Sequence, residues 1–256
     1  MSFTTILKYN FSKIKAPNLI DFYLFRLYNH LKFEHKIRKI KRKLKGNGVS
    51  YAKKYLFNDA NSKVLFIHIP KAAGMSVVKT LYNSDKSHHA SASDYLKEDK
   101  SQFESVYSFA ITRNPYMRLY SAYYYLKNGG MNKIDRAWWE LYLAQYESFE
   151  AFVIEGGLKF AIENKAEHFI PQYKFIFDEQ NNLQCNYVGK IENINDIELI
   201  LSKKLQREII FTHTNVMNKS KLIIRDIYTD EMLKVVNQCY QKDFILLAYN
   251  ILPVSD

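Results

Sequence analysis

Short runs of consecutive apolar residues alternate along this chain with stretches in which apolar residues recur every three or four positions. The apolar runs are rich in β-branched and aromatic side chains and span residues 64–69, 107–112 and 185–189. Continuous runs of this length are typical of strands buried on both faces of a parallel sheet. The helical spacing predicts helices over residues 76–82, 93–99, 134–146, 148–155, 192–206, 229–240 and 243–249, with one more starting at Pro115. This alternation predicts an α/β domain with a parallel sheet flanked by helices.

The first apolar run leads into a turn that can bind an anion. Pro70 stops the strand because it has no backbone N–H to donate, and a helical pattern begins near Met75. The free N–H groups and the positive end of the helix dipole then point at one spot, to which Lys71 adds a full charge. An ordinary strand-to-helix turn with a solvated lysine is the alternative interpretation.

The second apolar run ends in a similar turn. Asn114 is a favourable helix N-cap and Pro115 a favourable first helical residue. Arg113 lies just ahead of this helix, and Arg118 and Ser121 share one of its faces. Two guanidinium groups and a hydroxyl at one helix start predict a second anion site. The alternative is that the arginines pair with acidic residues of the fold.

The positive charge is concentrated at the N-terminal end. Residues 1–46 hold 12 Lys and Arg against two acidic residues, which gives +10 of the net charge of +11. Residues 18–45 are predicted as one basic amphipathic helix, and the glycines at 46 and 48 divide an arm, 1–48, from a domain, 49–256. This helix can pack its aromatic half on the domain or bind an anionic membrane surface. Nucleic acid is the weakest of the three interpretations, because the basicity belongs to the arm and not to the fold.

Several classes of protein are disfavoured by the sequence. Lysines interrupt any apolar segment near the N-terminus, and no apolar window is long enough to span a membrane, so we expect neither a signal peptide nor a transmembrane helix. Cys185 and Cys239 do not make a disulfide framework in a chain of this length, and no spacing typical of metal ligands occurs. We therefore expect a cytoplasmic protein, or one peripheral to the inner face of the membrane, without a metal.

Two anion sites at the carboxyl edge of one sheet suit a nucleoside with phosphates at both ends. The first loop lacks the glycine and lysine arrangement of nucleotide kinases, although a P-loop kinase-like phosphotransferase using a nucleoside triphosphate remains the alternative. Residues 68–76 and 113–123 resemble the 5′-phosphosulfate and 3′-phosphate motifs of the sulfotransferases that modify carbohydrates. Weaker similarities follow at residues 89–92, 168–172, 187–193, 218–220, 243–244 and 249.

The resemblance implies a P-loop-like fold and the donor 3′-phosphoadenosine-5′-phosphosulfate (PAPS), which leaves 3′,5′-bisphosphoadenosine (PAP) as product. Lys71 would neutralise the leaving oxygen, and Arg113 and Ser121 would hold the 3′-phosphate. The implied contacts to the 5′-phosphosulfate come from the residues of the first loop, Lys71, Ala72, Ala73, Gly74, Met75 and Ser76. A later segment, Asn218, Lys219 and Ser220, would close over the nucleotide. Relatives commonly carry Thr where this chain has Ala72 and Met75, which leaves Ser76 as the side-chain donor of the loop.

The resemblance also implies a base and an acceptor. His89 matches the position of the catalytic histidine of the family, and imidazole titrates near neutral pH, as a base for a hydroxyl group requires. His88 is the reserve candidate, and His88, His168 and Gln172 are candidate contacts to the substrate. The implied acceptor is a hydroxyl group of a glycan, and the composition favours a bacterial enzyme that modifies a surface polysaccharide or glycolipid precursor.

Overall fold

The computed structural model describes residues 64–84, 88–131, 133–211 and 223–255. The predicted arm, its boundary at residue 48 and the segment 218–220 lie outside these ranges. None of the helices in the described ranges combines the length and the apolar character needed to cross a membrane.

A parallel sheet lies at the centre of the domain. It consists of β1 (Val64–Ile67), β2 (Tyr107–Thr112) and β3 (Tyr187–Lys190) in the order β1-β2-β3, with all neighbours parallel. The predicted parallel sheet is therefore confirmed, although β3 begins two residues later than expected. Asn186 comes just before β3, and its side-chain oxygen accepts a hydrogen bond of 2.7 Å from the N–H of Ser108 in β2.

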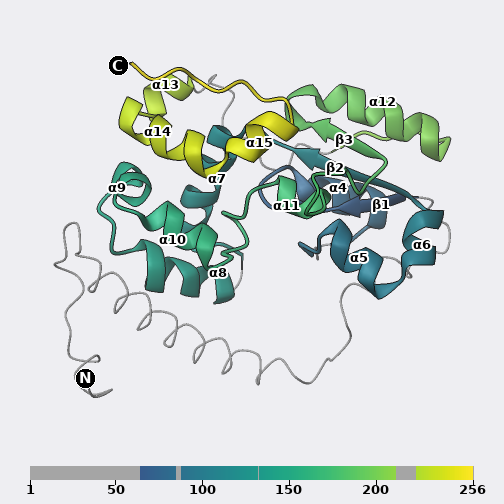
Figure 1. The fold of residues 1–256 in the computed structure, drawn as a ribbon. Coiled ribbons are helices and arrows are strands. Elements are labelled where there is room, and N and C mark those ends of the chain that lie inside the picture. Colours follow the sequence, from purple (N-terminus) through teal and green to yellow (C-terminus); the bar gives the residue numbers. More distant parts are fainter. Residues whose placement is uncertain (1–63, 85–87, 132, 212–222, 256) are drawn as a thin grey trace.

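Helices cover both faces of this sheet (Figure 1). On one face, Phe66 and Ile111 pack with α4 (Gly74–Tyr82) and α12 (Ile194–Leu205). On the other, Leu65 and Ala110 pack with α5 (Ala92–Glu98), α6 (Lys100–Ser105) and α11 (Tyr173–Ile176). Successive residues of a strand point to opposite faces, so both faces need apolar residues. This explains why the strands read as continuous apolar runs.

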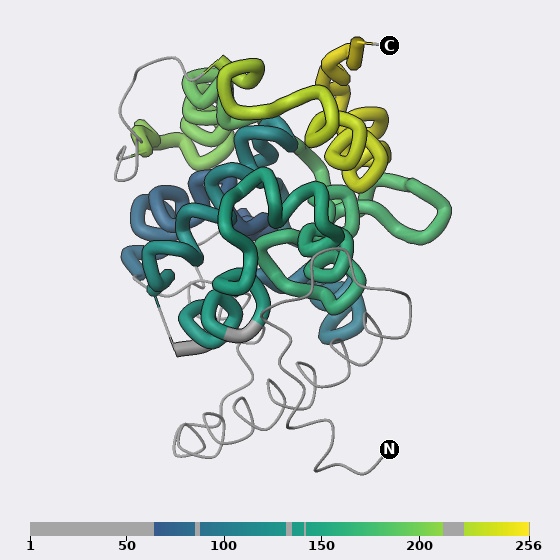
Figure 2. Tube along the Cα trace, turned by 90° about the vertical axis from the view of Figure 1, so that its left-hand side faces the viewer, coloured from purple at the N-terminus to yellow at the C-terminus, as the bar shows by residue number. Residues whose placement is uncertain are grey.

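A second, entirely helical core lies beside the sheet. Its elements are α7 (Pro115–Lys127), α8 (Lys133–Trp138), the π-helical turn η3 (Trp139–Leu143), α9 (Phe149–Ile154), α10 (Gly157–Glu163), α13 (Ile224–Ile227), α14 (Asp230–Cys239) and α15 (Gln241–Leu246). Tyr123 and Trp138 are buried in this core. Seen from the left of Figure 1, the helical core lies in front of the sheet (Figure 2).

The structure corrects several predicted elements. The single helix expected over residues 134–146 is α8 followed by a π-helical turn, and the helix expected from residue 192 opens with the 3₁₀ turn η4 (Ile191–Asn193). The short helices α6, α10, α11 and α13 were missed, because one or two turns carry too few apolar positions to show a period. Thr229 caps α14 as predicted, since its side chain accepts the N–H of Met232.

Candidate active site

The turn between β1 and α4 leaves the start of the helix open. Lys71 and Ala73 have positive φ angles of 69° and 62°, and Ala73 is the N-cap but offers no side-chain acceptor. The N–H groups of Gly74 and Met75 have no acceptor among the described residues. Positive φ is uncommon outside glycine, and strained backbone of this kind occurs at ligand sites. An uncapped helix start beside a lysine is suited to binding an anion.

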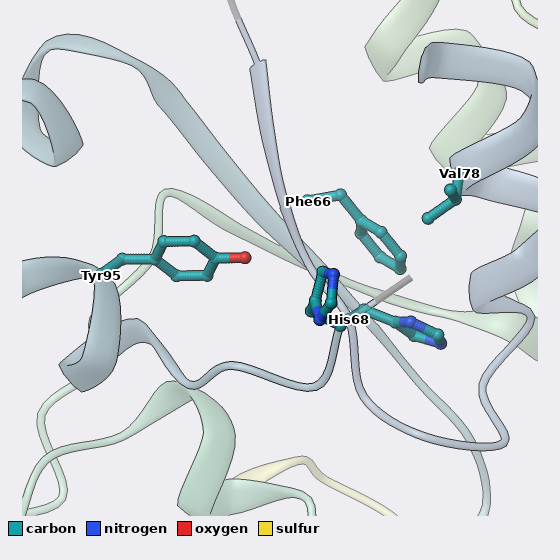
Figure 3. A pocket seen from close by; sticks show the side chains of 5 residues that line it. Phe66, His68, Val78 and Tyr95 are labelled. Atoms are coloured by element: carbon teal, nitrogen blue, oxygen red, sulfur yellow. The ribbon is translucent and has the colours of Figure 1, made fainter. Parts of the chain in front are cut away.

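Gly74 makes room for a buried histidine. A Cβ atom at Gly74 would lie 1.6 Å from Nε2 of His68, so the imidazole packs directly against the backbone of the helix start. His68 stacks on Phe66, with 5.5 Å between ring centroids, and meets the ring of His89 edge-on at 4.6 Å. Figure 3 shows His68 beyond the end of β1, between Tyr95 on one side and Val78 of α4 on the other. His68 therefore braces the loop and links it to His89.

In the turn after β2, a side chain of the protein caps the start of the following helix. The side chain of Asn114 accepts the N–H groups of Tyr116 and Met117, and the N–H of Asn114 donates to Glu192 at 2.7 Å. Asn114 caps α7 as predicted, and a capped helix start has fewer free N–H groups, so an anion at this turn would depend on side chains. Arg113 and the partly buried Ser121 remain as side-chain donors.

Arg118 points into the protein. It is 1% exposed, and its Nε donates to the carbonyl of Pro70 at 2.9 Å. It thereby ties α7 to the first loop, and it supports the helix without facing a ligand, which leaves Arg113 as the guanidinium group at this turn.

Lys71 and Arg113 form one positive region. Nη1 of Arg113 donates to the carbonyl of Lys71 at 3.4 Å, which joins the two turns. Burial lowers the pKa of Lys71 to about 8, and the charges of Arg113 and Arg118 act in the same direction, while Asp135 opposes them. The Nζ atom lies 3.6 Å from the ring centroid of Tyr125, a cation–π contact that favours the charged form.

Gln172 holds the backbone of Arg113 from both sides. Its Oε1 accepts the N–H of Arg113 at 2.9 Å, and its Nε2 donates to the carbonyl of Arg113 at 2.8 Å. The residue is fully buried and both polar atoms of its side chain bond to Arg113, which gives it a structural role, while its expected contact with the substrate stays a prediction. Its own N–H and that of Tyr173 donate to the buried Asp243, whose pKa burial raises to about 6.

Three imidazoles and two carboxylates gather next to the first loop. Nδ1 of His89 lies 3.0 Å from Oε2 of Glu167, and Nε2 of His168 lies 3.1 Å from Oδ1 of Asp135. The rings of His89 and His168 are 5.8 Å apart. His168 is buried, and its Nδ1 has no partner among the described residues.

His88 takes a different position from His89. It lines a small pocket with Phe66, His68, Val78 and Tyr95, between β1, α4 and α5. Burial, together with the neighbouring His89, lowers the pKa of His88. His88 is thus turned toward the sheet layer, while His89 is the member of the pair that meets His168.

Sequence reasoning missed three residues of this cluster, namely Tyr125, Asp135 and Glu167. Tyr125 stood in a run of tyrosines that is typical of a core, and nothing in its spacing marked Glu167. Nothing in the sequence marked Asp135 either; its place follows only from the structure, where Gly130 has a φ of +62° and a Cβ there would lie 2.2 Å from Cβ of Asp135. No three His, Cys, Asp or Glu side chains in the described ranges are arranged to hold a metal ion.

Comparison with known proteins agrees with this architecture. The model of the sulfotransferase family matches residues 53–250, which includes both turns, the histidine cluster and all three strands. A search of curated proteins finds no match. The open start of α4 beside Lys71 and the flanked parallel sheet are consistent with the family match. The chain belongs to the sulfotransferase family, and its general activity is the transfer of sulfuryl groups.

Proposed function

We propose that this protein transfers a sulfuryl group from PAPS to a hydroxyl group of a glycan, with His89 as the general base. The observation that carries the proposal is the uncapped start of α4, which lies beside Lys71 and Arg113 and is linked through His68 to His89.

The donor side is a strongly positive region with free N–H groups. Lys71 and the backbone of residues 72–76 would surround the 5′-phosphosulfate, with Ser76 as the side-chain donor, and Arg113 and Ser121 would hold the 3′-phosphate. PAPS supplies the sulfuryl group and a phosphate leaving group. Lys71 would neutralise the charge that develops on the leaving oxygen, because a preorganised positive charge stabilises a transition state in which charge builds up.

The acceptor side is the histidine cluster. His89 would take the proton of the attacking hydroxyl group, which requires a base whose neutral form is abundant near pH 7. His168 would contact the acceptor through its Nδ1, since an unpaired buried nitrogen gains a hydrogen bond there. The glycan class rests on the resemblance of residues 68–76 and 113–123 to carbohydrate sulfotransferases. A surface polysaccharide or glycolipid precursor in a bacterial cytoplasm would be an acceptor of this kind.

Binding of PAP by calorimetry tests the donor site. Lys71→Ala and Arg113→Ala should each weaken binding by at least tenfold, because each removes a charge-assisted contact of about 1.5–3 kcal/mol. Lys79→Ala is the matched control, as Lys79 is an exposed lysine at the far end of α4, and it should bind like the wild type. Mg-ATP that binds more tightly than PAP would overturn the proposal in favour of a phosphotransferase.

Transfer from labelled PAPS to a panel of oligosaccharides tests the reaction. His89→Gln should lower the turnover by about 100-fold or more with little change in PAP affinity, because a general base contributes that much to the rate. Full activity in this variant would contradict the assignment of the base.

A further inference from the structure

Two carboxylate–imidazole pairs share a pair of residues that are adjacent in sequence. Glu167 pairs with His89 at 3.0 Å, and the next residue, His168, pairs with Asp135 at 3.1 Å. Two adjacent residues after α10 therefore take part in both pairs: Glu167 binds the imidazole of His89, and His168 is bound by the carboxylate of Asp135.

Glu167 is exposed, but the backbone that carries it is fixed. Its side chain is 62% exposed. The segment is closed by a hydrogen bond of 2.8 Å from the N–H of Phe169 to the carbonyl of Ala166. His168 is anchored to the buried Asp135, which also accepts the hydroxyl of Tyr125 at 2.7 Å. An ionised group on a fixed turn can hold a partner in one orientation at little entropic cost.

The pairing determines which nitrogen of His89 carries the proton. The hydrogen bond to His89 is the main cause that lowers the pKa of Glu167, so this carboxyl group is ionised near neutral pH. An ionised carboxylate only accepts hydrogen bonds, which requires that Nδ1 of His89 donates. Nε2 then carries the lone pair of the ring.

We propose that Glu167 is a positioning residue, which holds His89 in the Nδ1–H tautomer and stabilises the imidazolium formed during transfer. The inference rests on the proposed function. In the step, the O–H bond of the acceptor breaks and its proton passes to Nε2 of His89. The acceptor oxygen forms the new S–O bond while the S–O bond to the 5′-phosphate breaks. The positive charge on the imidazolium then faces the carboxylate of Glu167.

The other titratable groups around His89 cannot replace this charge. The groups that interact with it are His68 from the end of β1, the adjacent His88, and Glu167 and His168 from the turn after α10. Of these, only Glu167 is negative, because burial lowers the pKa of each of the three histidines and leaves them neutral near pH 7. The other carboxylate of the cluster, Asp135, is paired with His168. Glu167 is therefore the counter-ion for a positive charge that forms on His89 during transfer.

Nitrogen NMR of the full chain with labelled histidine tests the tautomer without any need for activity. The signals of His89 are identified from their loss in His89→Gln. The wild type and Glu167→Gln should show the Nδ1–H tautomer, because the amide oxygen still accepts, while Glu167→Ala should shift toward Nε2–H. An unchanged tautomer in Glu167→Ala would overturn the inference.

Kinetics with the same variants test the role in catalysis. We expect kcat/KM to fall about tenfold in Glu167→Gln and about 100-fold in Glu167→Ala, with PAP affinity within twofold of the wild type. The acid limb of the pH profile should move to lower pH in Glu167→Gln, because a neutral amide no longer favours the imidazolium. Glu179→Gln, the same change at an exposed glutamate before β3, is the control and should behave like the wild type.

The outcomes separate this inference from the proposed function. Wild-type rates in both Glu167 variants, or a loss of rate together with PAP affinity at an unmoved acid limb, would overturn the positioning role. If the tautomer changes in Glu167→Ala as expected but the wild type transfers no sulfuryl group, the proposed function is overturned and the pairing is left intact.

Discussion

The surroundings of Lys71 change its pKa in opposite directions. Burial and the neighbouring guanidinium groups lower its pKa to about 8, whereas Asp135 and the face of Tyr125 favour the protonated amine. An anion that binds at the start of α4 would add a strong attraction and raise the pKa again. Donor binding and protonation of this lysine should therefore be linked.

We expect PAP to bind with constant affinity up to about pH 7 and progressively more weakly above pH 8. The sign follows from the linkage. The bound state prefers the protonated amine, and the free protein loses that proton as the pH rises through about 8. The affinity should then fall by roughly tenfold per pH unit until the lysine of the complex also loses its proton. Calorimetry between pH 6.5 and 9.5 measures this, with proton uptake read from two buffers of different ionisation enthalpy.

Lys71→Arg is the control for this effect, because guanidinium keeps its charge throughout the range. Its affinity, although lower if the geometry suffers, should not fall above pH 8. The same alkaline loss in Lys71→Arg would show that another group is responsible.

At the scale of elements, the two strand-to-helix turns use opposite solutions for the start of the helix. Asn114 caps α7 with its side chain, whereas Ala73 leaves α4 open. The open turn needs Gly74, since His68 occupies the space that a side chain would fill. Close packing between this glycine and the imidazole of His68 fixes the position of the loop relative to His89.

Gly74→Ala should destabilise the protein by about 2 kcal/mol, although alanine is the better helix former by about 1 kcal/mol. The added Cβ would lie 1.6 Å from the imidazole of His68, so either the ring or the helix start must move. Urea denaturation measures the change. Replacing His68 by Ala in the same chain should recover part of the loss, which a double-mutant cycle reports as coupling.

Gly129→Ala serves as the comparison. A Cβ at Gly129 meets nothing within 4 Å, but its φ of +92° is unfavourable for alanine, so we expect a loss of about 1 kcal/mol that His68→Ala does not change. Equal coupling at both glycines would refute the packing explanation.

At the scale of the whole molecule, the candidate site lies where the sheet and the helical core meet. Lys71 and His89 belong to loops after β1 and α4, whereas Tyr125, Asp135 and Glu167 come from α7, α8 and the segment after α10. Cofactor and active sites commonly lie at such junctions, because groups from two separately packed units can converge there.

A chain that begins at residue 49 should bind PAP as tightly as the full chain, because the described candidate site lies entirely within residues 64–255. The same deletion should abolish binding to phosphatidylcholine–phosphatidylglycerol vesicles, since residues 1–46 hold +10 of the net charge. Sedimentation with vesicles measures this. Binding by the full chain should weaken as the salt concentration rises, because salt shortens the Debye length and screens the attraction between the basic residues and the anionic lipid. Salt-independent binding, or none, would refute the expected membrane contact.

The two strand-to-helix turns could be predicted from the sequence, because the residues that form each turn lie within a few positions of one another. Asn114 caps α7 through hydrogen bonds from the N–H groups of Tyr116 and Met117, and Pro70 lies in the turn three residues after the end of β1 at Ile67. Both turns and the parallel sheet therefore follow from short stretches of sequence. The buried positions of Tyr123 and Trp138 follow in the same way from helical spacing.

The pairings that shape the histidine cluster were decided only by tertiary structure. Glu167 meets His89 across 78 positions of sequence, and His168 meets Asp135 across 33. No local pattern specifies such partners, because they depend on how the helical core packs against the sheet. The same holds for Gln172, whose buried amide holds the backbone of Arg113 across 59 positions. The sequence by itself therefore determined the strands, the two strand-to-helix turns and the candidate residues on them, while only the packing of the two cores decided which side chains hold those residues in place.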